Sequence, residues 1–361
     1  MDSSALEGEI NGGHGGVRRM GKTIIRIPNH LGDAVMAQPA VRSFVKNNPK
    51  EEIHLLLPEW AGPIYADSGC GALIGLGRRD LHGFGAVSRR VRMIREKDYD
   101  RGVLLTPSFS SALTFYLAGV RERFGFAGDG RGIFLTQRYR ESAAAGAHRT
   151  EKYNFLLREV GGCEAKSGRP DVVVREQAKL NAEGLLKEEG MELTDQYMAI
   201  SPRAVAESRR WGEERYSALA ARIVSECGFK AVLVGTADDY GAGEVVRGDR
   251  KEIINVCGKT DIEMLAAILS GARLFIGNDS GSAHLAAAVD TALVVLSGAD
   301  RPSETSPLSD KKMVIIKDYL ECISCVKNKC PKKGSAYMRC MRDIEVKEVF
   351  EAVLKVLEMV G

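Results

Sequence analysis

The alternation of apolar and polar positions divides the chain into two consecutive series of short strands and helices. Continuous apolar runs predict buried strands at residues 23–27, 53–57, 103–105 and 123–126 in the first half, and at residues 197–202, 230–235, 253–256, 272–276 and 291–296 in the second half. Most of these runs are followed by a turn and a helix. Because strands that alternate with helices form parallel sheets, the sequence predicts an α/β protein with two doubly wound, Rossmann-like domains facing a central cleft.

The second half is organised around residues 277–288, which follow one predicted strand and lead through an Ala-rich helix into the next. Ser280 and Gly281 fall at the start of this helix, where free backbone N–H groups favour a phosphate and a glycine lets a ligand come close. Asp279 can hold sugar hydroxyls at the carboxyl edge of the sheet, with His284 one helical turn further on. The alternative is that Asp279 and Ser280 only cap the helix.

The first strand runs into a similar turn and helix. Asp33 lies near the start of that helix, at the carboxyl edge of the sheet, as either a functional carboxylate or a plain helix cap. Further along, Arg89, Arg90, Arg92 and Arg95 occupy one predicted helix. A solvated helix face is the main interpretation of these arginines, and contact with an anionic substrate or a lipid surface is the alternative.

Length and composition indicate how many domains the chain forms and in which cellular compartment it is expected. A chain of 361 residues exceeds one ordinary hydrophobic core, and no apolar run is long enough to span a membrane. Residues 1–19 lack the apolar centre of a signal peptide, which predicts a disordered tail, with Met20 as the alternative start, and a cytoplasmic protein. The net charge of +3 is too small to indicate nucleic-acid binding. The predicted units are the tail 1–19, an N-terminal domain 20–175, a C-terminal domain 190–342, and a C-terminal helix 343–361 that packs back on the N-terminal domain.

Eight cysteines in a long cytoplasmic chain do not suggest a disulfide framework. Four of them lie close together in the sequence, at Cys322, Cys325, Cys330 and Cys340. This spacing would suit a structural zinc ion. The preferred interpretation is reduced thiols in a packed loop.

Motifs spread along the chain occur in one fixed order. They lie at residues 28–36, 109–113 with 128–136, 209–211, 258–260 and 278–288, followed by the cysteine segment. Together they resemble the ADP-heptose:lipopolysaccharide heptosyltransferases, glycosyltransferase family 9, from about Met20 to the C-terminus. The likeness is greatest to the enzymes that add the second heptose. The resemblance implies a GT-B fold whose N-terminal domain binds the acceptor and whose C-terminal domain binds the nucleotide sugar.

The resemblance also implies an activity. The family moves L-glycero-D-manno-heptose from ADP-heptose to the inner core of lipopolysaccharide in Gram-negative bacteria, with inversion and with no cofactor or essential metal. Its members meet their acceptor at the inner face of the cytoplasmic membrane, so peripheral membrane contact is expected. Two alternatives stay open: a family 9 transferase that uses another sugar or acceptor, and a non-catalytic protein that binds a nucleotide sugar.

The family's functional positions fall on particular residues of this chain. Asp33 matches the catalytic base. Arg209 stands where the family usually has a lysine that contacts the donor phosphate, and Asp238 or Asp239 matches the acidic residue at the ribose. The donor loop falls on Asp279, Ser280, Gly281 and His284. The chain departs from the family pattern at positions 282–283, where Ser-Ala replaces a common Pro-Met.

Overall fold

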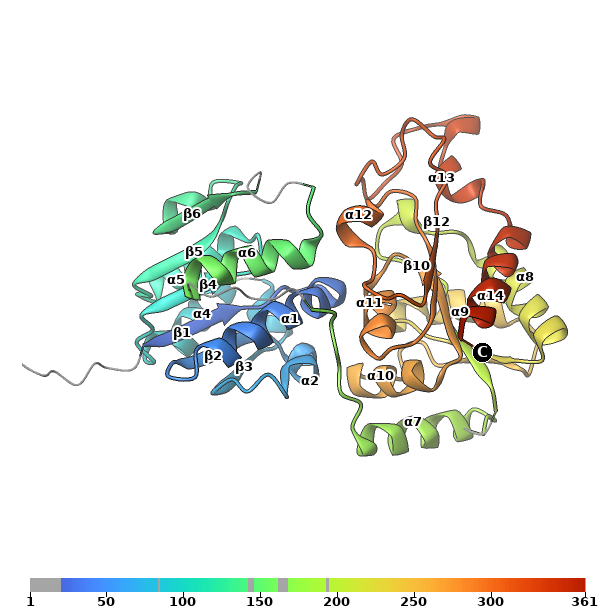
Figure 1. Cartoon of the computed structure of the whole chain (residues 1–361), viewed down its shortest axis with the longest axis horizontal. Helices are drawn as coiled ribbons and strands as arrows, with labels where there is room; N and C mark the ends of the chain where they lie inside the picture. Colours follow the sequence, from blue (N-terminus) through green and yellow to red (C-terminus); the bar gives the residue numbers. More distant parts are fainter. Residues whose placement is uncertain (1–20, 84, 142–145, 162–167, 193–194, 361) are drawn as a thin grey trace, which may run out of the picture.

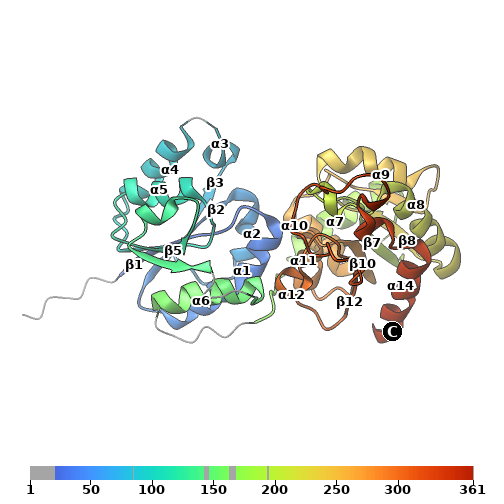
Figure 2. The same cartoon turned by 90° about the horizontal axis from the view of Figure 1, so that it is seen from above.

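The computed structural model describes residues 21–83, 85–141, 146–161, 168–192 and 195–360, so the predicted tail 1–19 lies outside the described residues. Two α/β domains stand side by side, each built on a six-stranded parallel sheet (Figure 1). The view from above shows α1, α2 and α10–α12 along the boundary between the domains (Figure 2). The predicted doubly wound α/β fold is confirmed.

The N-terminal sheet has the strand order β3-β2-β1-β4-β5-β6. Its strands are β1 Lys22–Arg26, β2 Glu52–Pro58, β3 Ala72–Leu76, β4 Arg101–Leu104, β5 Glu122–Ala127 and β6 Gln137–Arg140. Its helices are α1 Leu31–Asn47, α2 Gly62–Tyr65, α3 Arg78–Leu81, α4 Ala86–Arg95, α5 Phe109–Leu117 and α6 Arg149–Gly161, with short 3-10 turns η1 Glu59–Ala61 and η2 Arg131–Phe134.

The C-terminal sheet has the order β12-β11-β10-β7-β8-β9. Its strands are β7 Tyr197–Ser201, β8 Lys230–Leu233, β9 Ile253–Asn255, β10 Leu274–Asn278, β11 Leu293–Leu296 and β12 Lys312–Ile315. The helices are α7 Glu176–Glu188, α8 Glu213–Arg222, α9 Tyr240–Arg247, α10 Ile262–Gly271, α11 Gly281–Ala288, α12 Pro302–Thr305, α13 Arg339–Arg342 and α14 Val346–Val360. Shorter helical turns are η4 Glu207–Arg209, η5 Ile223–Cys227, η6 Ala237–Asp239 and η7 Gly334–Ala336.

Both sheets have the same winding. Each starts on a central strand, proceeds to one edge, and returns to the other side of that first strand, so the order switches between β1 and β4 and between β7 and β10. In open α/β sheets, ligands bind beyond the carboxyl ends of the strands at such a switch point. The turns after β1 and β10 carry Asp33 and Asp279, so the topology places both carboxylates at switch points.

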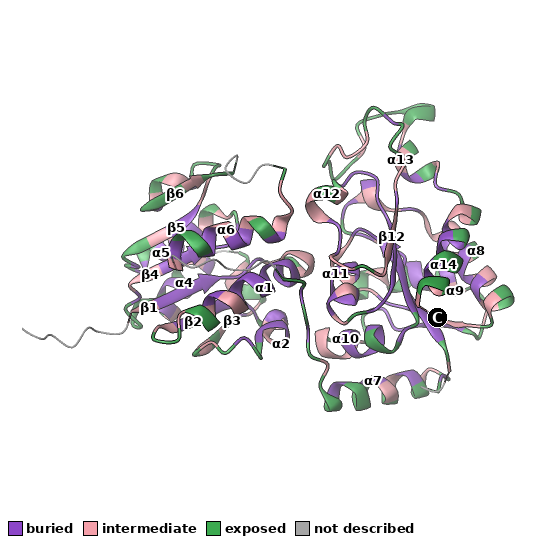
Figure 3. Cartoon of the chain, viewed as in Figure 1, coloured by how far each residue is buried: buried purple, intermediate pink, exposed green. Residues whose placement is uncertain are grey.

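The strand predictions were right for the centres of the sheets and for the edge strand β9, and they missed the other three edge strands. The central strands are buried on both faces (Figure 3), which is why they appear in the sequence as continuous apolar runs. The sequence analysis missed β3, β6 and β12, and all three are edge strands with few buried residues. Of these, only β6 is a polar strand without an apolar run, whereas β3 and β12 contain short apolar runs that the sequence analysis did not count as strands.

The C-terminal helix corrects one prediction. Residues 343–361 were expected to pack on the N-terminal domain, but α14 packs on α8 and on β10–β12 of its own domain. Its apolar stripe, formed by Val349, Val353 and Val356, is buried in the C-terminal core together with Phe350. A helix with one apolar face packs on the nearest exposed face of a sheet. For α14 this is a face of the C-terminal sheet. None of the helices within the described residues is long and apolar enough to cross a membrane.

Candidate functional site

A cavity of about 350 Å³ opens at the carboxyl edge of the N-terminal sheet. It lies beyond β1, β4 and β5, between the first turns of α1, α5 and α6. Its lining combines apolar groups with charged ones, including Asp33, Leu104, Phe126, Arg131, Glu141, Arg149, Lys152 and Tyr153. A cavity at a switch point with converging polar side chains is the usual form of a small-molecule site in such folds.

Asp33 is turned into this cavity rather than used as a cap. The residue that caps α1 is His30, whose side chain makes no capping hydrogen bond. The Asp33 Oδ1 atom accepts hydrogen bonds from Arg149 Nη1 at 2.8 Å and from the Tyr153 hydroxyl at 3.2 Å. Oδ2 accepts no hydrogen bond within the described residues, so one oxygen of this cavity-lining carboxylate keeps its lone pairs available.

The two partners of Asp33 come from one face of α6, where they are four residues apart. Burial, and then the nearby Asp33 carboxylate, raises the pKa of Tyr153 well above its ordinary value, so the phenol stays protonated and donates. The guanidinium of Arg149 balances the negative charge of Asp33. The sequence analysis missed both residues, although their i, i+4 spacing could have shown that they share a helix face.

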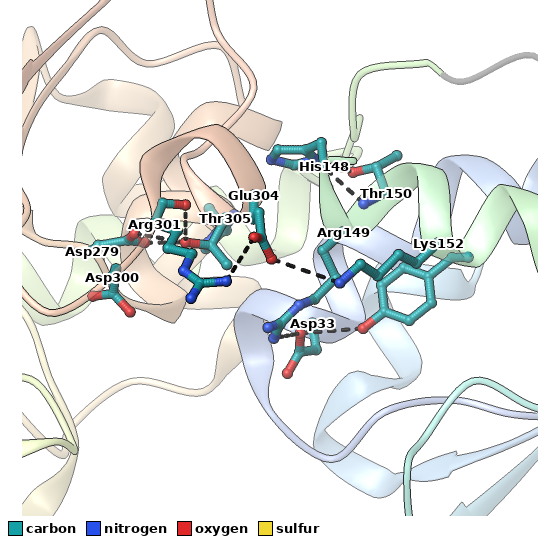
Figure 4. A network of polar contacts seen from close by, with 12 residues as sticks. Asp33, His148, Arg149, Thr150, Lys152, Asp279, Asp300, Arg301, Glu304 and Thr305 are labelled. Carbon is teal, nitrogen blue, oxygen red and sulfur yellow. Dashed lines mark hydrogen bonds and ion pairs between the residues drawn. The ribbon is translucent and has the colours of Figure 1, made fainter. Parts of the chain in front are cut away.

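Asp279 stands on the opposite side of the domain boundary (Figure 4). Its side chain is almost fully buried, and Oδ2 accepts a hydrogen bond from Thr305 Oγ1 at 3.1 Å. The ring of His284, one turn into α11, places Nε2 at 3.7 Å from Asp279 Oδ1. The predicted grouping of Asp279 with His284 is therefore present, and Thr305 is a partner that the sequence analysis did not identify.

The N-terminal domain comes close to the backbone at Gly281. A side chain built on Gly281 would place its Cβ 2.7 Å from Leu31 Cβ, and one on Gly32 would come within 2.8 Å of His284 Cδ2. The glycines thus let the first turns of α1 and α11 meet across the domain boundary. The group that comes closest to Gly281 is Leu31, because the two domains are in contact there.

Arg209 ends the η4 turn and is held by a residue from the loop after β11. Its Nη2 atom lies 2.6 Å from Asp300 Oδ1. Asp300 is buried, and burial, followed by the negative charge of Asp279, raises its pKa to about 7. The sequence analysis did not propose Asp300 as a site residue, because the contact joins positions 91 residues apart in the chain.

Several buried polar atoms near these residues have no hydrogen-bond partner among the described residues. They are Asn278 Oδ1, Ser280 Oγ, Ser297 Oγ, Asp300 Oδ2 and Arg209 Nε. The first four follow or end the central strands β10 and β11, at the carboxyl edge of the sheet, and Arg209 is joined to them through Asp300. Buried polar groups in proteins are nearly always satisfied by protein, ordered water or a ligand, so this concentration makes the carboxyl edge of the sheet a candidate place for a polar ligand.

The two candidate acidic residues after β8 have different surroundings. Asp239 accepts hydrogen bonds at Oδ2 from the Thr236 backbone N–H at 2.9 Å and from the Thr236 hydroxyl at 2.8 Å, and so caps the η6 turn. Asp238 is exposed and makes no side-chain contact within the described part of the chain. The geometry thus favours Asp238 for contact with a ligand, since Asp239 already has a structural role.

Side chains also connect the two domains above this site. Lys152 Nζ of α6 lies 3.7 Å from Glu304 Oε2 of α12, and His148 Nε2 lies 3.0 Å from the Ser306 carbonyl oxygen. Figure 4 shows Glu304 between Lys152 and Arg301, which holds it from its own domain at 3.1 Å. These contacts place the α12 loop against the rim of the N-terminal cavity.

The four clustered cysteines are all described and all carry free thiols. Burial raises the pKa of Cys340 to about 11, with smaller contributions from Cys325, Cys330 and Cys322, so the four lie in one neighbourhood. No group of three or more His, Cys, Asp or Glu side chains within the described residues is placed to hold a metal ion. Reduced thiols and a structural zinc ion therefore both stay predictions for this segment.

Two doubly wound domains whose switch points face each other form the GT-B architecture. The chain belongs to glycosyltransferase family 9 (heptosyltransferase), whose sequence model matches residues 87–336. It is 29% identical to lipopolysaccharide heptosyltransferase 2 of Salmonella typhimurium over 308 residues, which cover 81% of this chain and 87% of that relative. The Escherichia coli protein of the same name is 28% identical over 313 residues, with the same coverage.

Solved structures agree with this assignment over nearly the whole chain. The structure described as E. coli ADP-heptose lps heptosyltransferase II superposes with a TM-score of 0.76 at 25% identity, covering 94% of this chain and 99% of that one. A family 9 glycosyl transferase from Veillonella parvula gives a TM-score of 0.79 at 20% identity, covering 94% and 97%, which supports the fold. The chain is therefore an enzyme, a glycosyltransferase with the GT-B fold.

Proposed function

We propose that this glycosyltransferase moves L-glycero-D-manno-heptose from ADP-heptose to the inner core of lipopolysaccharide, where it adds the second heptose. The names of the two bacterial relatives and the likeness to the E. coli structure over both domains support this substrate pair. The single observation that carries a catalytic role is that Asp33 lines the cavity with Oδ1 fixed by Arg149 and Tyr153, while Oδ2 has no hydrogen-bond partner within the described residues.

In the proposed mechanism Asp33 is the general base. An acceptor hydroxyl is a weak nucleophile, and a carboxylate within hydrogen-bond reach can take its proton while its oxygen attacks the anomeric carbon. Attack from the N-terminal domain on a sugar held by the C-terminal domain displaces the diphosphate from the opposite face, which gives inversion. The contacts to Oδ1 hold the carboxylate in one orientation, with Oδ2 toward the acceptor.

The leaving ADP gains negative charge as the glycosidic bond breaks. We assign its stabilisation to the guanidinium of Arg209 and to the N-terminal turn of α11 at Ser280 and Gly281, which supply fixed positive charge without requiring a metal ion. Asp300 holds Arg209 at 2.6 Å until the diphosphate competes for it. The unpartnered Ser280 hydroxyl is a further donor on the same side.

We assign recognition of the donor's heptose and ribose to Asp279, His284 and Asp238. Asp279 and His284 lie side by side at the domain boundary and can hold heptose hydroxyls. Asp238 is the better candidate for the ribose because Asp239 is occupied by Thr236. The acceptor belongs to a membrane-anchored lipid, so we place the enzyme at the inner face of the cytoplasmic membrane as a peripheral protein.

The proposal is tested by the mass of the product formed from ADP-heptose and a purified core acceptor that lacks its second heptose. We expect the acceptor mass to increase by one heptose, and the initial rate to survive EDTA. An acceptor that already carries the second heptose is the matched control and should not react. Transfer from another nucleotide sugar but not from ADP-heptose would show that the enzyme uses a different donor.

A further inference from the structure

A group of exposed apolar side chains on the N-terminal domain has no part in the proposed chemistry. Phe109, Tyr116 and Leu117 of α5 and Ile133 of the neighbouring η2 turn are 43% to 74% exposed. The partly buried ring of Phe134 joins them, with its centroid 5.2 Å from that of Phe109 and 5.5 Å from that of Tyr116. We call these five side chains the α5–η2 surface. Exposed apolar side chains that gather in this way usually mark an interaction site.

Arginines surround this surface. Arg95 Nη2 donates a hydrogen bond to the Leu117 carbonyl oxygen at 2.7 Å, and the Arg123 guanidinium lies over the Tyr116 ring, 5.5 Å from its centroid. Arg92 is exposed on α4, the helix that packs beside α5. Within the described residues none of these three arginines forms an ion pair, so their positive charge is available to a partner. The arginine-rich helix of the sequence analysis thus borders an apolar surface.

The α5–η2 surface is continuous with the wall of the N-terminal cavity. Ser108 and Ala112 at the start of α5, and Arg131 and Leu135 at the two ends of η2, line that cavity. The exposed Asp129 carboxylate in the loop before η2 is matched by Arg131 at 3.3 Å. A partner bound to the surface would therefore lie next to the place where the acceptor is expected to enter.

We propose that the α5–η2 surface docks on a bilayer that contains anionic phospholipids. Aromatic and aliphatic side chains bordered by arginines are the chemistry of interfacial binding, in which apolar groups enter the headgroup region and cations meet acidic lipids. The inference rests on the proposed function in one respect, namely that the acceptor in the adjacent cavity is anchored in that bilayer. Docking then holds the cavity beside lipid-anchored acceptors and limits the search for them to the membrane surface.

Vesicle sedimentation tests the docking without any catalytic step. The full chain should sediment with vesicles of phosphatidylcholine and phosphatidylglycerol, much less with phosphatidylcholine alone, and less as salt is added. Ile133→Ser should weaken binding roughly ten-fold, the effect of removing one inserted aliphatic side chain. Arg92→Gln and Arg95→Gln should each weaken it about five-fold. The matched controls Met359→Ser and Lys355→Gln, exposed positions on α14, should leave binding unchanged.

Equal binding of the Ile133→Ser and Met359→Ser variants to the anionic vesicles would overturn the proposal. So would a dimer in light scattering that Ile133→Ser converts to a monomer with no change in vesicle binding, since a second copy would then be the occupant. Activity separates this inference from the proposed function: the surface variants should transfer heptose normally to a detergent-dispersed acceptor and slowly to one embedded in vesicles. Suppose that neither the wild type nor any variant transfers heptose, while the surface variants still lose vesicle binding and the control variants do not. The proposed function would then be wrong, and the docking surface would be supported.

Discussion

The segments that lead from β1 into α1 and from β10 into α11 occupy equivalent places in the two domains, yet they present their carboxylates in opposite ways. Asp33 is open to a cavity, keeps one oxygen available, and has a cation at 2.8 Å. Asp279 is buried, with a hydroxyl at 3.1 Å and a histidine at 3.7 Å. In the proposed function, the same strand–turn–helix unit supplies a reactive carboxylate in one domain and a recognition carboxylate in the other. Neighbouring helices, rather than the turn itself, make the difference.

The largest expected effect comes from Asp33→Asn. This substitution preserves the side-chain shape but removes the group that takes the acceptor proton, so the initial rate should fall by ~10²–10⁴-fold while the melting temperature changes little. Rates and thermal melting measured on the same preparation check both statements. Asp318→Asn, at an exposed position of the C-terminal domain, is the control. Near-normal turnover of Asp33→Asn would remove the proposed distinction between the two carboxylates.

Arg209→Ala should cost ~10²–10³-fold in turnover, the effect of losing one fixed donor at a developing charge. Arg209→Lys should retain more activity, because an ammonium can still meet the diphosphate. Calorimetric titration with ADP, combined with initial rates, separates binding from catalysis. The neighbouring Arg210, which donates to the Ala204 carbonyl oxygen at 2.9 Å, provides the control variant Arg210→Ala. If Arg209→Ala and Arg209→Lys behave alike, the phosphate role is wrong.

The contact between the two turns is tested by Gly281→Ala. The new Cβ would lie 2.7 Å from Leu31 Cβ, so the domains must separate locally, and misplacing the donor against Asp33 can cost up to about 10²-fold in rate. Leu31→Gly in the same chain removes the obstructing atoms and should restore part of the loss. Gly241→Ala, where an added Cβ meets nothing within 4 Å, is the control. Full activity of Gly281→Ala would show that this close contact is not needed for catalysis.

The pKa of Asp300 predicts a pH-dependent stability. Because its folded-state value of about 7 exceeds its ordinary value of 3.8, the folded chain binds more protons than the unfolded chain between these two values. The contribution of Asp300 to the free energy of unfolding therefore falls by about 1–3 kcal/mol as the pH rises through that window. It stays at this lower value at higher pH. Denaturant unfolding of wild type and Asp300→Asn across that window should show the difference, and parallel curves would contradict the buried-carboxyl assignment.

The carboxylates at the two switch points could be predicted from sequence, and their partners could not. Asp33 and Asp279 each follow a continuous apolar run, so the position of the strand end gives the position of the side chain. Arg149 contacts Asp33 across 116 residues of sequence, and that contact depends on how α6 packs on α1. Local patterns contain no information on such pairings. The packing of α14 was predicted wrongly for a related reason, since it depends on which surfaces the rest of the fold leaves uncovered.

The smallest expected effect concerns the ion pair that joins the domains, between Lys152 and Glu304. The two side chains are partly exposed and their charged atoms are 3.7 Å apart, so the pair contributes only about 0.2–1 kcal/mol and is screened by salt. Glu304→Gln should therefore lower the initial rate less than about five-fold, and the gap to wild type should narrow as potassium chloride is added. The charge-exchanged pair Lys152→Glu with Glu304→Lys should recover part of the loss seen in Lys152→Glu alone. A defect in Glu304→Gln as large as that of Asp33→Asn would place a third carboxylate in the chemistry, and the contrast between one reactive and one recognition carboxylate would no longer describe the site.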